Sequence, residues 1–373
     1  MDSQVFFTVW MLTAVEGGSV EFRLINPPSA APDGFTWNFG STQICTATGG
    51  PPFISPCYRN RVSVDPTTAT LELRDLTLSD TGEYNLNIVI NSVENNAAAT
   101  LTVFERISSV TLVASHTDLV EFNSSVTLTC SASGSPTSFQ WFNRSDEVTG
   151  SDGGTLTIES VTRYDTGPYK CNASNIVSFG MSSEVTMTIA YGPDTADIRV
   201  TPAEEFYSSG STIVLSCSSE SSPAAQIQWA LNGTLLGREG PELRLENVQP
   251  SQSGEYTCWA HNSKTLRYKL SSPTSVTVLE RISEPAITMS GPEQLIANKS
   301  SVSLTCEAKG FITTREWMKD GETLSPCNRI TFSEDNRTVS ISVVLEEDEG
   351  EYKCRLSSPV SNEEASKQLT VGE

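Results

Sequence analysis

The cysteines are the residues of this sequence whose possible chemistry is easiest to constrain, and there are nine of them. Thiols can ligate a metal, act as nucleophiles or pair as disulfides. The chain has no C-x-x-C pair and only two histidines, so spacing indicates neither a zinc nor a haem site. Six cysteines recur as pairs roughly 40 to 50 residues apart, and each closed loop of that length is worth about 4 kcal/mol. The predicted disulfides are Cys130–Cys171, Cys217–Cys258 and Cys306–Cys354.

The other three cysteines do not follow this spacing. Cys45 and Cys57 lie close together in the chain, and we expect them to form a local disulfide rather than bridge to another chain. Cys327 has no nearby partner, so it is either a free thiol buried in a domain or the site of an interchain bridge. Paired cysteines favour an oxidising compartment, and hence an extracellular or cell-surface location.

Acceptors for N-linked glycans support the same location. Six N-x-S/T sequences occur, and a set of this size is expected of a secreted glycoprotein that carries N-glycans. None lies in the first hundred or so residues, which leaves the surface of that segment free for close contact. The predicted acceptors are Asn123, Asn143, Asn172, Asn232, Asn298 and Asn336.

A short motif built around a tyrosine repeats four times along the chain. Each tyrosine follows a glycine by two residues, and an acidic residue or Gln252 precedes the glycine. In three copies a cysteine comes two residues after the tyrosine, and in the first copy Leu86 takes that place. This pattern is typical of the tyrosine corner of immunoglobulin-like sandwiches. The four tyrosines are Tyr84, Tyr169, Tyr256 and Tyr352.

The elements that must position these residues are strands. Apolar residues alternate before each corner, and a tryptophan lies between the two cysteines of each pair, so both sulfurs and the indole face the space between two sheets. The sequence therefore predicts an all-β chain of four tandem immunoglobulin-like β-sandwich domains, the last three disulfide-bonded and of I/C type. The predicted domains are 1–105, 106–191, 192–281 and 282–373, and the tryptophans are Trp37, Trp141, Trp229 and Trp317.

The first repeat departs from the others in two ways. Leu24 and Leu86 stand at the two disulfide positions, and a packed leucine pair can keep the apolar burial without the covalent restraint. The stretch from Trp37 to Leu86 is also long enough for two added strands, which predicts a variable-type domain. Two Arg–Asp pairs share one spacing and predict salt bridges that close the sandwich in the first and fourth repeats. They are Arg61–Asp80 and Arg329–Asp348.

The two ends of the chain give little targeting information. Residues 5–15 are apolar but lack a basic residue before them and a small-residue cleavage site after them, so we expect the first strand there rather than a signal peptide. No stretch of about 20 apolar residues follows the last strand, and no lipid-anchor tail is present. A membrane anchor is therefore expected to be absent from this chain.

Several classes of function are disfavoured by the sequence. Nucleophile-elbow, HExxH, phosphate-loop and GxGxxG motifs are all missing, so we expect no enzyme, no catalytic residues, no metal, no cofactor and no small-molecule substrate. A formal charge of −21 would repel nucleic acid and anionic membranes. Recognition of another protein is the function class that these observations leave.

The first domain resembles the N-terminal domain of the carcinoembryonic-antigen-related cell adhesion molecule family of the immunoglobulin superfamily, which also lacks the inter-sheet disulfide. The stretches that carry the resemblance are residues 34–37 (GFTW), 80–88 (DTGEYNLNI) and 191–194 (YGPD). The resemblance covers all four domains in order. It implies an extracellular adhesion or recognition protein that binds a homophilic or heterophilic immunoglobulin-domain partner through the exposed C-F-G sheet face of the first domain.

Strand parity and the resemblance together give the expected binding residues. With Trp37 and Leu86 facing inward, alternate residues face outward and match the family's contact positions. The family's aliphatic contact on the next strand corresponds to Gln43 or Ile44. A soluble decoy or spacer ectodomain of an immune-regulatory receptor, with a heterophilic ligand, is the alternative function. The expected binding residues are Thr36, Asn38, Gln43, Asn87 and Val89.

Overall fold

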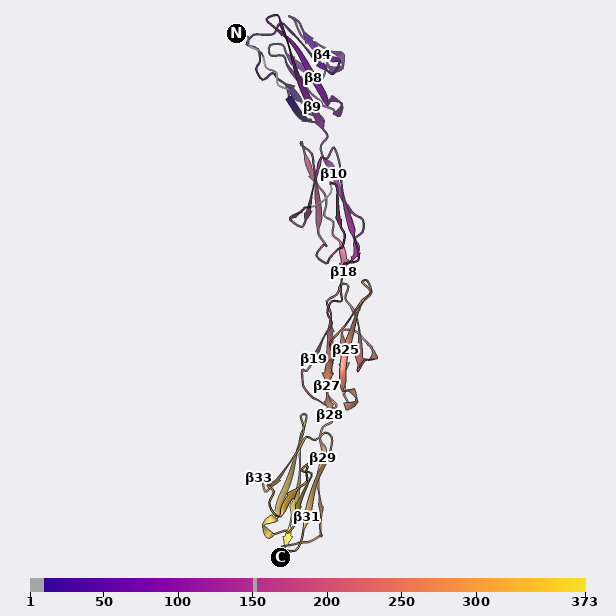
Figure 1. Cartoon of the computed structure of the whole chain (residues 1–373), viewed down its shortest axis with the longest axis vertical. Helices are drawn as coiled ribbons and strands as arrows, with labels where there is room; N and C mark the ends of the chain where they lie inside the picture. Colours follow the sequence, from indigo (N-terminus) through magenta and orange to yellow (C-terminus); the bar gives the residue numbers. More distant parts are fainter. Residues whose placement is uncertain (1–9, 150–152) are drawn as a thin grey trace. The chain divides into compact units, whose positions relative to one another are not determined.

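The computed structural model describes residues 10–149 and 153–373, and these form strands joined by turns and four short 3₁₀ helices (Figure 1). The chain divides into two compact units, Met1–Ile189 and Ala190–Glu373. Each unit holds two β-sandwiches, which confirms the predicted fold class of four tandem immunoglobulin-like domains. No helix among the described residues has the length and apolar character needed to cross a membrane.

The first domain is a variable-type sandwich with a large sheet of six strands. The strand β1 pairs in parallel with β9, and the remaining neighbours are antiparallel. The strand β1 covers residues 10–15 of the apolar segment 5–15, in which the first strand was expected. Residues 5–9 lie outside the described part of the chain. In spatial order the sheet contains β1 (Trp10–Val15), β9 (Val93–Phe104), β8 (Gly82–Ile90), β3 (Gly34–Phe39), β4 (Thr42–Ala47) and β5 (Phe53–Ile54).

The facing sheet of the first domain has three strands. Two 3₁₀ helices, η1 (Pro56–Tyr58) and η2 (Leu78–Asp80), connect strands at its margins. Two added strands were predicted from the long stretch between Trp37 and Leu86. They are present as β5 in the large sheet and β6 in the small one. In spatial order the small sheet contains β2 (Val20–Phe22), β7 (Thr70–Leu73) and β6 (Val62–Asp65).

The second domain has a smaller set of strands. A three-stranded sheet faces a four-stranded sheet, and a short pair of strands lies beside them. The three groups are β10 (Ser108–Ala114), β12 (Val126–Ser133) and β15 (Thr155–Ile158); then β14 (Asp146–Val148), β13 (Ser138–Asn143), β16 (Tyr169–Ser174) and β17 (Phe179–Met181); then β11 (Asp118–Val120) and β18 (Thr188–Ala190).

The third domain repeats this arrangement, with the additional strand β27 paired to β25 and the helix η3 (Pro250–Gln252) before β25. Its elements are β19 (Asp197–Thr201), β21 (Ile213–Ser218) and β24 (Glu242–Leu245); β23 (Thr234–Glu239), β22 (Gln226–Leu231), β25 (Gly254–Asn262), β26 (Arg267–Leu270) and β27 (Thr274–Val276); and β20 (Tyr207–Ser208) with β28 (Val278–Leu279).

The fourth domain has one more strand in its first sheet, β34, which agrees with the longer fourth repeat. The helix η4 (Glu346–Asp348) precedes β36. Its elements are β29 (Ser283–Ser290), β31 (Val302–Lys309), β35 (Thr338–Ile341) and β34 (Ile330–Phe332); β33 (Glu322–Thr323), β32 (Thr314–Lys319), β36 (Gly350–Ser357) and β37 (Asn362–Leu369); and β30 (Leu295–Ile296) with β38 (Val371–Gly372).

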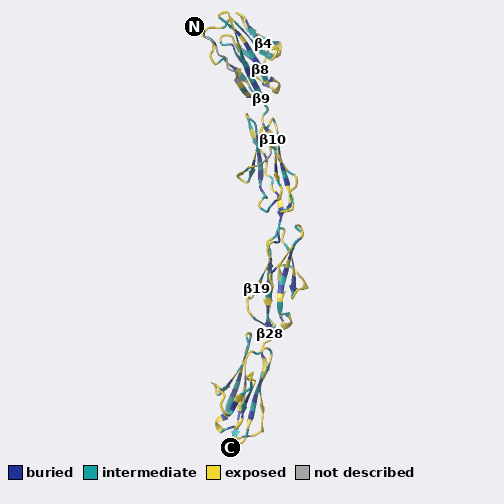
Figure 2. Cartoon of the chain, viewed as in Figure 1, coloured by how far each residue is buried: buried dark blue, intermediate teal, exposed yellow. Residues whose placement is uncertain are grey.

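A buried tryptophan organises each core, with buried residues lining the space between the sheets (Figure 2). Every indole N–H donates to a backbone carbonyl across the core, which satisfies the only polar group of a fully enclosed side chain. The four bonds are Trp37 to Ala69 at 2.9 Å, Trp141 to Gly153 at 3.3 Å, Trp229 to Gly240 at 2.9 Å and Trp317 to Asn336 at 2.7 Å.

Three of the four predicted disulfides form. They join Cys130 to Cys171, Cys217 to Cys258 and Cys306 to Cys354, each between the two sheets of one domain. The predicted Cys45–Cys57 disulfide is wrong, because Cys45 faces the core opposite Trp37 while Cys57 is exposed on η1. Cys327 is free and exposed, so the buried-thiol interpretation is also wrong.

The tyrosine corner is present in three domains. The hydroxyls of Tyr84, Tyr256 and Tyr352 each donate to the backbone carbonyl four residues earlier, at 2.7 to 3.0 Å. In the second domain the Tyr169 hydroxyl instead accepts a long 3.4 Å bond from the Asn143 amide. Both predicted salt bridges are confirmed, Arg61 with Asp80 and Arg329 with Asp348.

The joint at residues 191–194 packs onto the third domain. The Asn262 amide donates to the Tyr191 carbonyl at 2.9 Å, and the Thr265 hydroxyl donates to the Gly192 carbonyl. A Cβ on Gly192 would lie 2.3 Å from the Glu220 carbonyl oxygen, and its φ of +73° is strained for other residues. Glycine is therefore required at this joint.

Candidate binding face of the first domain

The outward face of the six-stranded sheet contains the residues that the sequence singled out. In β3 and β8, Trp37 is paired with Leu86 and both side chains are buried, so their sequence neighbours point to solvent. Thr36 lies opposite Asn87, and Val89 lies opposite Gly34. The backbone positions Asn38 beside Gln43 of β4. The structure thus brings together the five predicted binding residues on one face.

Pairing across the strands arranges this face into two rows. Each member of a row is the direct cross-strand partner of the next, and neighbouring strands lie about 4.8 Å apart, so five strands span about 20 Å. The first row is Asn96, Asn87, Thr36, Thr46 and Phe53, and the second is Ala98, Asn85, Asn38 and Gln43. We call these nine residues the amide face.

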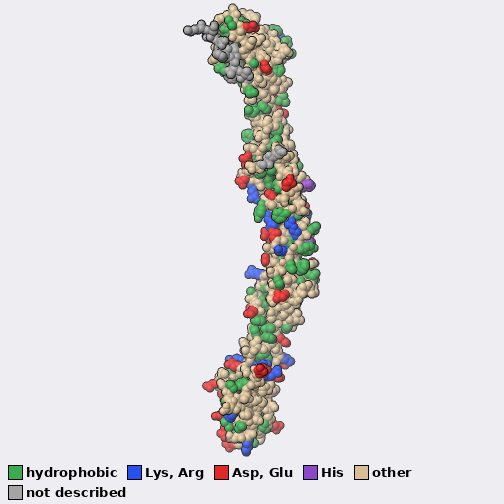
Figure 3. Space-filling view, viewed as in Figure 1, with side chains coloured by type: hydrophobic (Ala, Val, Ile, Leu, Met, Phe, Trp, Pro, Cys, Tyr) green, Lys and Arg blue, Asp and Glu red, His purple; other side chains and the backbone are tan. Residues whose placement is uncertain are grey.

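The amide face is uncharged, although the whole chain has a formal charge of −21. Its polar groups are side-chain amides and hydroxyls, which can both donate and accept hydrogen bonds. The Thr36 and Thr46 hydroxyls are already bonded to each other at 3.0 Å. Figure 3 shows few acidic or basic side chains over the first domain in that view. Such a surface can be dehydrated at lower cost than a charged one.

A β-bulge decides which residue of β4 reaches this face. The register shifts between Trp37–Cys45 and Asn38–Gln43, so Ile44 is the extra residue and its side chain is fully buried. Of the two residues expected from the resemblance, Gln43 faces out and Ile44 does not. The bulge also turns Cys45 inward, where burial raises the pKa of its thiol to about 11.

Of the nine residues of the amide face, sequence reasoning missed five. They are Asn85, Asn96, Ala98, Thr46 and Phe53. Phe53 is 54 % exposed at the end of the first row and provides the one aromatic ring on the amide face. The strand that carries it has only two residues, so no alternation in the sequence could indicate it. Aromatic side chains commonly dominate the energetics of interfaces.

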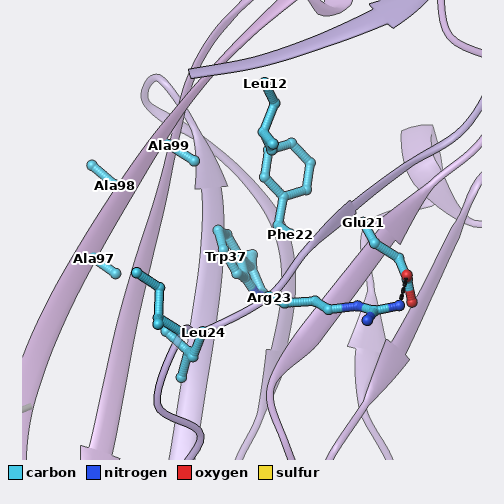
Figure 4. Close-up of a pocket in the computed structure, with 10 residues that line it drawn as sticks. Leu12, Glu21, Phe22, Arg23, Leu24, Trp37, Ala97, Ala98 and Ala99 are labelled. Carbon is cyan, nitrogen blue, oxygen red and sulfur yellow. Dashed lines mark hydrogen bonds and ion pairs between the residues drawn. The ribbon is translucent and has the colours of Figure 1, made fainter. Parts of the chain in front are cut away.

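A hollow lies beside β9 in the first domain, next to Leu24, one of the two residues at the disulfide positions. It has a volume of about 420 Å³ and is lined mainly by apolar side chains. Figure 4 shows Leu24 and Trp37 side by side, with Ala97, Ala98 and Ala99 of β9 on one flank and the Glu21–Arg23 ion pair on the other. Leu86 is fully buried, but Leu24 is only half-buried against this hollow.

The expected glycan acceptors differ in accessibility. Asn123, Asn232, Asn298 and Asn336 are exposed, whereas Asn143 and Asn172 are half-buried. The Asn172 amide donates to Gln140 at 3.1 Å, in the middle of the outward face of the second domain. Among the described residues no cluster of three or more His, Cys, Asp or Glu side chains could hold a metal ion.

Comparison with known proteins supports the fold. Immunoglobulin-domain models match residues 109–175 and 284–358, and a second such model matches residues 197–278. The peroxidasin homolog of Mus musculus is 27% identical over 271 residues, which is 68% of this chain but only 18% of that protein. This chain thus spans less than a fifth of that relative.

Two solved structures are similar in fold at low sequence identity. Murine CEACAM1b is 24% identical with a TM-score of 0.42, covering 48% of this chain and 95% of that one. The ectodomain of mouse nectin-like molecule 4 is 21% identical with a TM-score of 0.45, covering 72% of this chain and 98% of that one.

Proposed function

Because the chain belongs to the immunoglobulin superfamily, we propose that it is an extracellular recognition or adhesion protein that binds an immunoglobulin-domain partner, homophilic or heterophilic, through the amide face of its first domain. The single observation that carries this proposal is a row of five outward-facing residues, uncharged and with no glycan acceptor nearby, in an otherwise acidic chain. The row of about 20 Å is wide enough for one side of a standard interface.

Membership of the carcinoembryonic-antigen-related family is part of this proposal. It is supported by the leucines at the disulfide positions of the first domain and by the glycine-dependent joint at residues 191–194. The location outside the cell is supported by three inter-sheet disulfides, which persist in oxidising compartments.

The experiment is to place a glycan or a charge at the centre of the amide face of the full chain. Val89→Thr creates an N-x-T acceptor at Asn87, and Asn87→Arg introduces an unpaired charge into the first row. Beads coated with the unaltered chain should aggregate with themselves or bind cells. Both variants should weaken this binding at least tenfold, because the glycan blocks close contact and the arginine would bury an unpaired charge, which is costly.

Asn60→Arg is the matched control, since Asn60 is exposed in the turn before β6 and lies off the amide face. It should leave binding unchanged. Loss of binding with the control as well as with Asn87→Arg would contradict the proposal. So would a chain whose cell binding survives both alterations at Asn87, which would favour a spacer or decoy role for the first domain.

A further inference from the structure

The four domains differ at one equivalent position on the strand that carries the corner tyrosine. This position is the third residue after that tyrosine. This residue points outward at the centre of the sheet. In the second domain it is Asn172, an expected glycan acceptor, and in the fourth it is Arg355, held by Glu364 at 2.9 Å and Glu316 at 3.8 Å. In the third domain it is Trp259, whose side chain is 42 % exposed. In the first domain it is Asn87 of the amide face, so the third domain alone places a large apolar side chain at this position.

Trp259 forms one wall of a hollow of about 500 Å³ on the third domain. Trp259 pairs with Gln228 on one side and with Leu270 on the other. In the next row, His261 pairs with Tyr268, and their rings stack with centroids 4.1 Å apart. Tyr268 is 65 % exposed, so two aromatic rings at adjacent rows are open to solvent.

The opposite wall of this hollow is polar. Gln226 and Gln228 contribute side-chain amides, and Glu239 of β23 contributes a carboxylate. The Gln228 amide donates to the Glu239 carboxylate at 3.3 Å, which holds both groups at the margin of the hollow. No lysine or arginine lines the hollow. We call these residues, together with Trp259, His261 and Tyr268, the aromatic hollow.

The two walls place different demands on a ligand. Exposed aromatic faces favour a ligand with an apolar C–H surface, whereas the amides and the carboxylate need hydrogen-bond partners. A wholly apolar protein side chain would dehydrate Glu239 without a partner, which is unfavourable. An anionic ligand would meet this carboxylate, and no lysine or arginine lines the hollow to offset the repulsion. A pyranose ring has an apolar face and hydroxylated edges and carries no charge.

We propose that the aromatic hollow of the third domain is a binding site for a neutral saccharide, stacked on Trp259 and Tyr268 and hydrogen-bonded to Gln228 and Glu239. The site is separate from the amide face and does not rest on its function. Its volume falls in the range of known small-ligand sites, about 300 to 1,000 Å³.

Saturation-transfer NMR on the intact chain tests this proposal, after enzymatic trimming of its own N-glycans. The probes are methyl α-mannoside, methyl β-galactoside and N,N′-diacetylchitobiose at millimolar concentration. At least one probe should receive magnetisation, mainly on the C–H protons of one ring face. Trp259→Ala and Tyr268→Ala should each reduce the signal at least fivefold, and Trp259→Phe should retain most of it because stacking is preserved.

Tyr164→Ala is the matched control, since Tyr164 is an exposed tyrosine of the second domain outside the aromatic hollow. It should leave transfer unchanged. Glu239→Gln should weaken binding several-fold without abolishing it, because an amide can still accept a hydroxyl hydrogen bond. Thermal unfolding of each variant should match the parent, since the altered side chains face solvent.

Three results would overturn the proposal. The first is no transfer to any of the three neutral probes. The second is preferential binding of arginine methyl ester that weakens with salt and is lost in Glu239→Gln, which would assign the site to a cationic group. The third is light scattering that shows a dimer dispersed by Trp259→Ala, which would assign the face to a second copy of the chain.

Discussion

The first and second domains solve the same packing problem in different ways. In the second domain a disulfide joins Cys130 and Cys171 across the sheets. In the first, the strand registers place Leu24 and Leu86 at the equivalent positions, and the sandwich still forms. The difference teaches that alternating apolar residues around a buried tryptophan suffice for the fold, whereas the disulfide adds stability by restricting the unfolded chain.

Removal of a disulfide should give the largest effect and tests this comparison directly. The paired variant Cys130→Ala with Cys171→Ala should lose about 4 kcal/mol, because a loop of about 40 residues is no longer closed in the unfolded state. Hydrogen exchange followed by mass spectrometry on peptides of each domain measures this. Reductant should likewise destabilise the last three domains and leave the first unchanged. A first domain that loosens on reduction would contradict the account.

The two leucines of the first domain should not be equivalent. Leu86 is fully buried, so Leu86→Ala should cost about 3 kcal/mol. Leu24 is half-buried beside the hollow, so Leu24→Ala should cost only about 1 kcal/mol. Denaturant unfolding monitored through first-domain peptides compares the two variants. Equal losses in the free energy of unfolding would mean that the two leucines are packed equally well. The hollow beside Leu24 would then have no effect on stability.

The Arg61–Asp80 salt bridge should make the first domain sensitive to acid. Burial by itself would raise the pKa of Asp80, but hydrogen bonds from Arg61 and Thr77 outweigh it and hold the pKa below its ordinary value. A folded pKa below the unfolded one stabilises the domain above about pH 4, and the gain is lost as pH falls through the folded pKa.

Arg61→Ala tests this contribution. It should cost roughly 2 kcal/mol at neutral pH, because the buried carboxylate of Asp80 loses its partner. The loss should shrink as the pH falls and Asp80 becomes protonated in the folded chain, first in the variant and then in the parent, because a neutral carboxyl no longer attracts the arginine. Urea unfolding at several pH values gives both quantities. A cost that does not vary with pH would show that packing of the arginine, rather than its charge, stabilises the domain.

Thiol reactivity should show the smallest effect, with no change in stability. Cys57 and Cys327 are exposed and should react with iodoacetamide in the folded chain. Cys45 should react only after unfolding, since it is buried and its pKa is raised to about 11. Peptide mapping under non-reducing conditions identifies the labelled sites. A linked Cys45–Cys57 peptide would contradict the structure.

Much of the fold could be predicted because its signals are local in the sequence. A strand's inward residues recur every second position, so the inward direction of Trp37 and Leu86 and the outward direction of Thr36 and Asn87 followed from parity. The three disulfides followed from pairs of cysteines 41, 41 and 48 residues apart in three repeats. The Arg61–Asp80 bridge followed from a spacing shared with the fourth repeat.

Other features depended on contacts that the sequence does not encode locally. One inserted residue at Ile44 reversed the parity of β4 after Gln43, so that Cys45 turned away from Cys57. The motif of the second domain has Pro168 where the other three copies have glutamate, but this difference did not indicate that the hydroxyl of Tyr169 would have a different partner.

By itself the sequence determined the four cores, because alternation, tryptophan and paired cysteines specify which side of each strand is buried. The tertiary structure alone decided which outward side chains lie next to each other, such as Phe53 with Thr46 and His261 with Tyr268. The physical reason is that cross-strand neighbours are set by register and bulges between strands far apart in the chain. Binding surfaces are made of such neighbours, whereas cores are made of patterns within each strand.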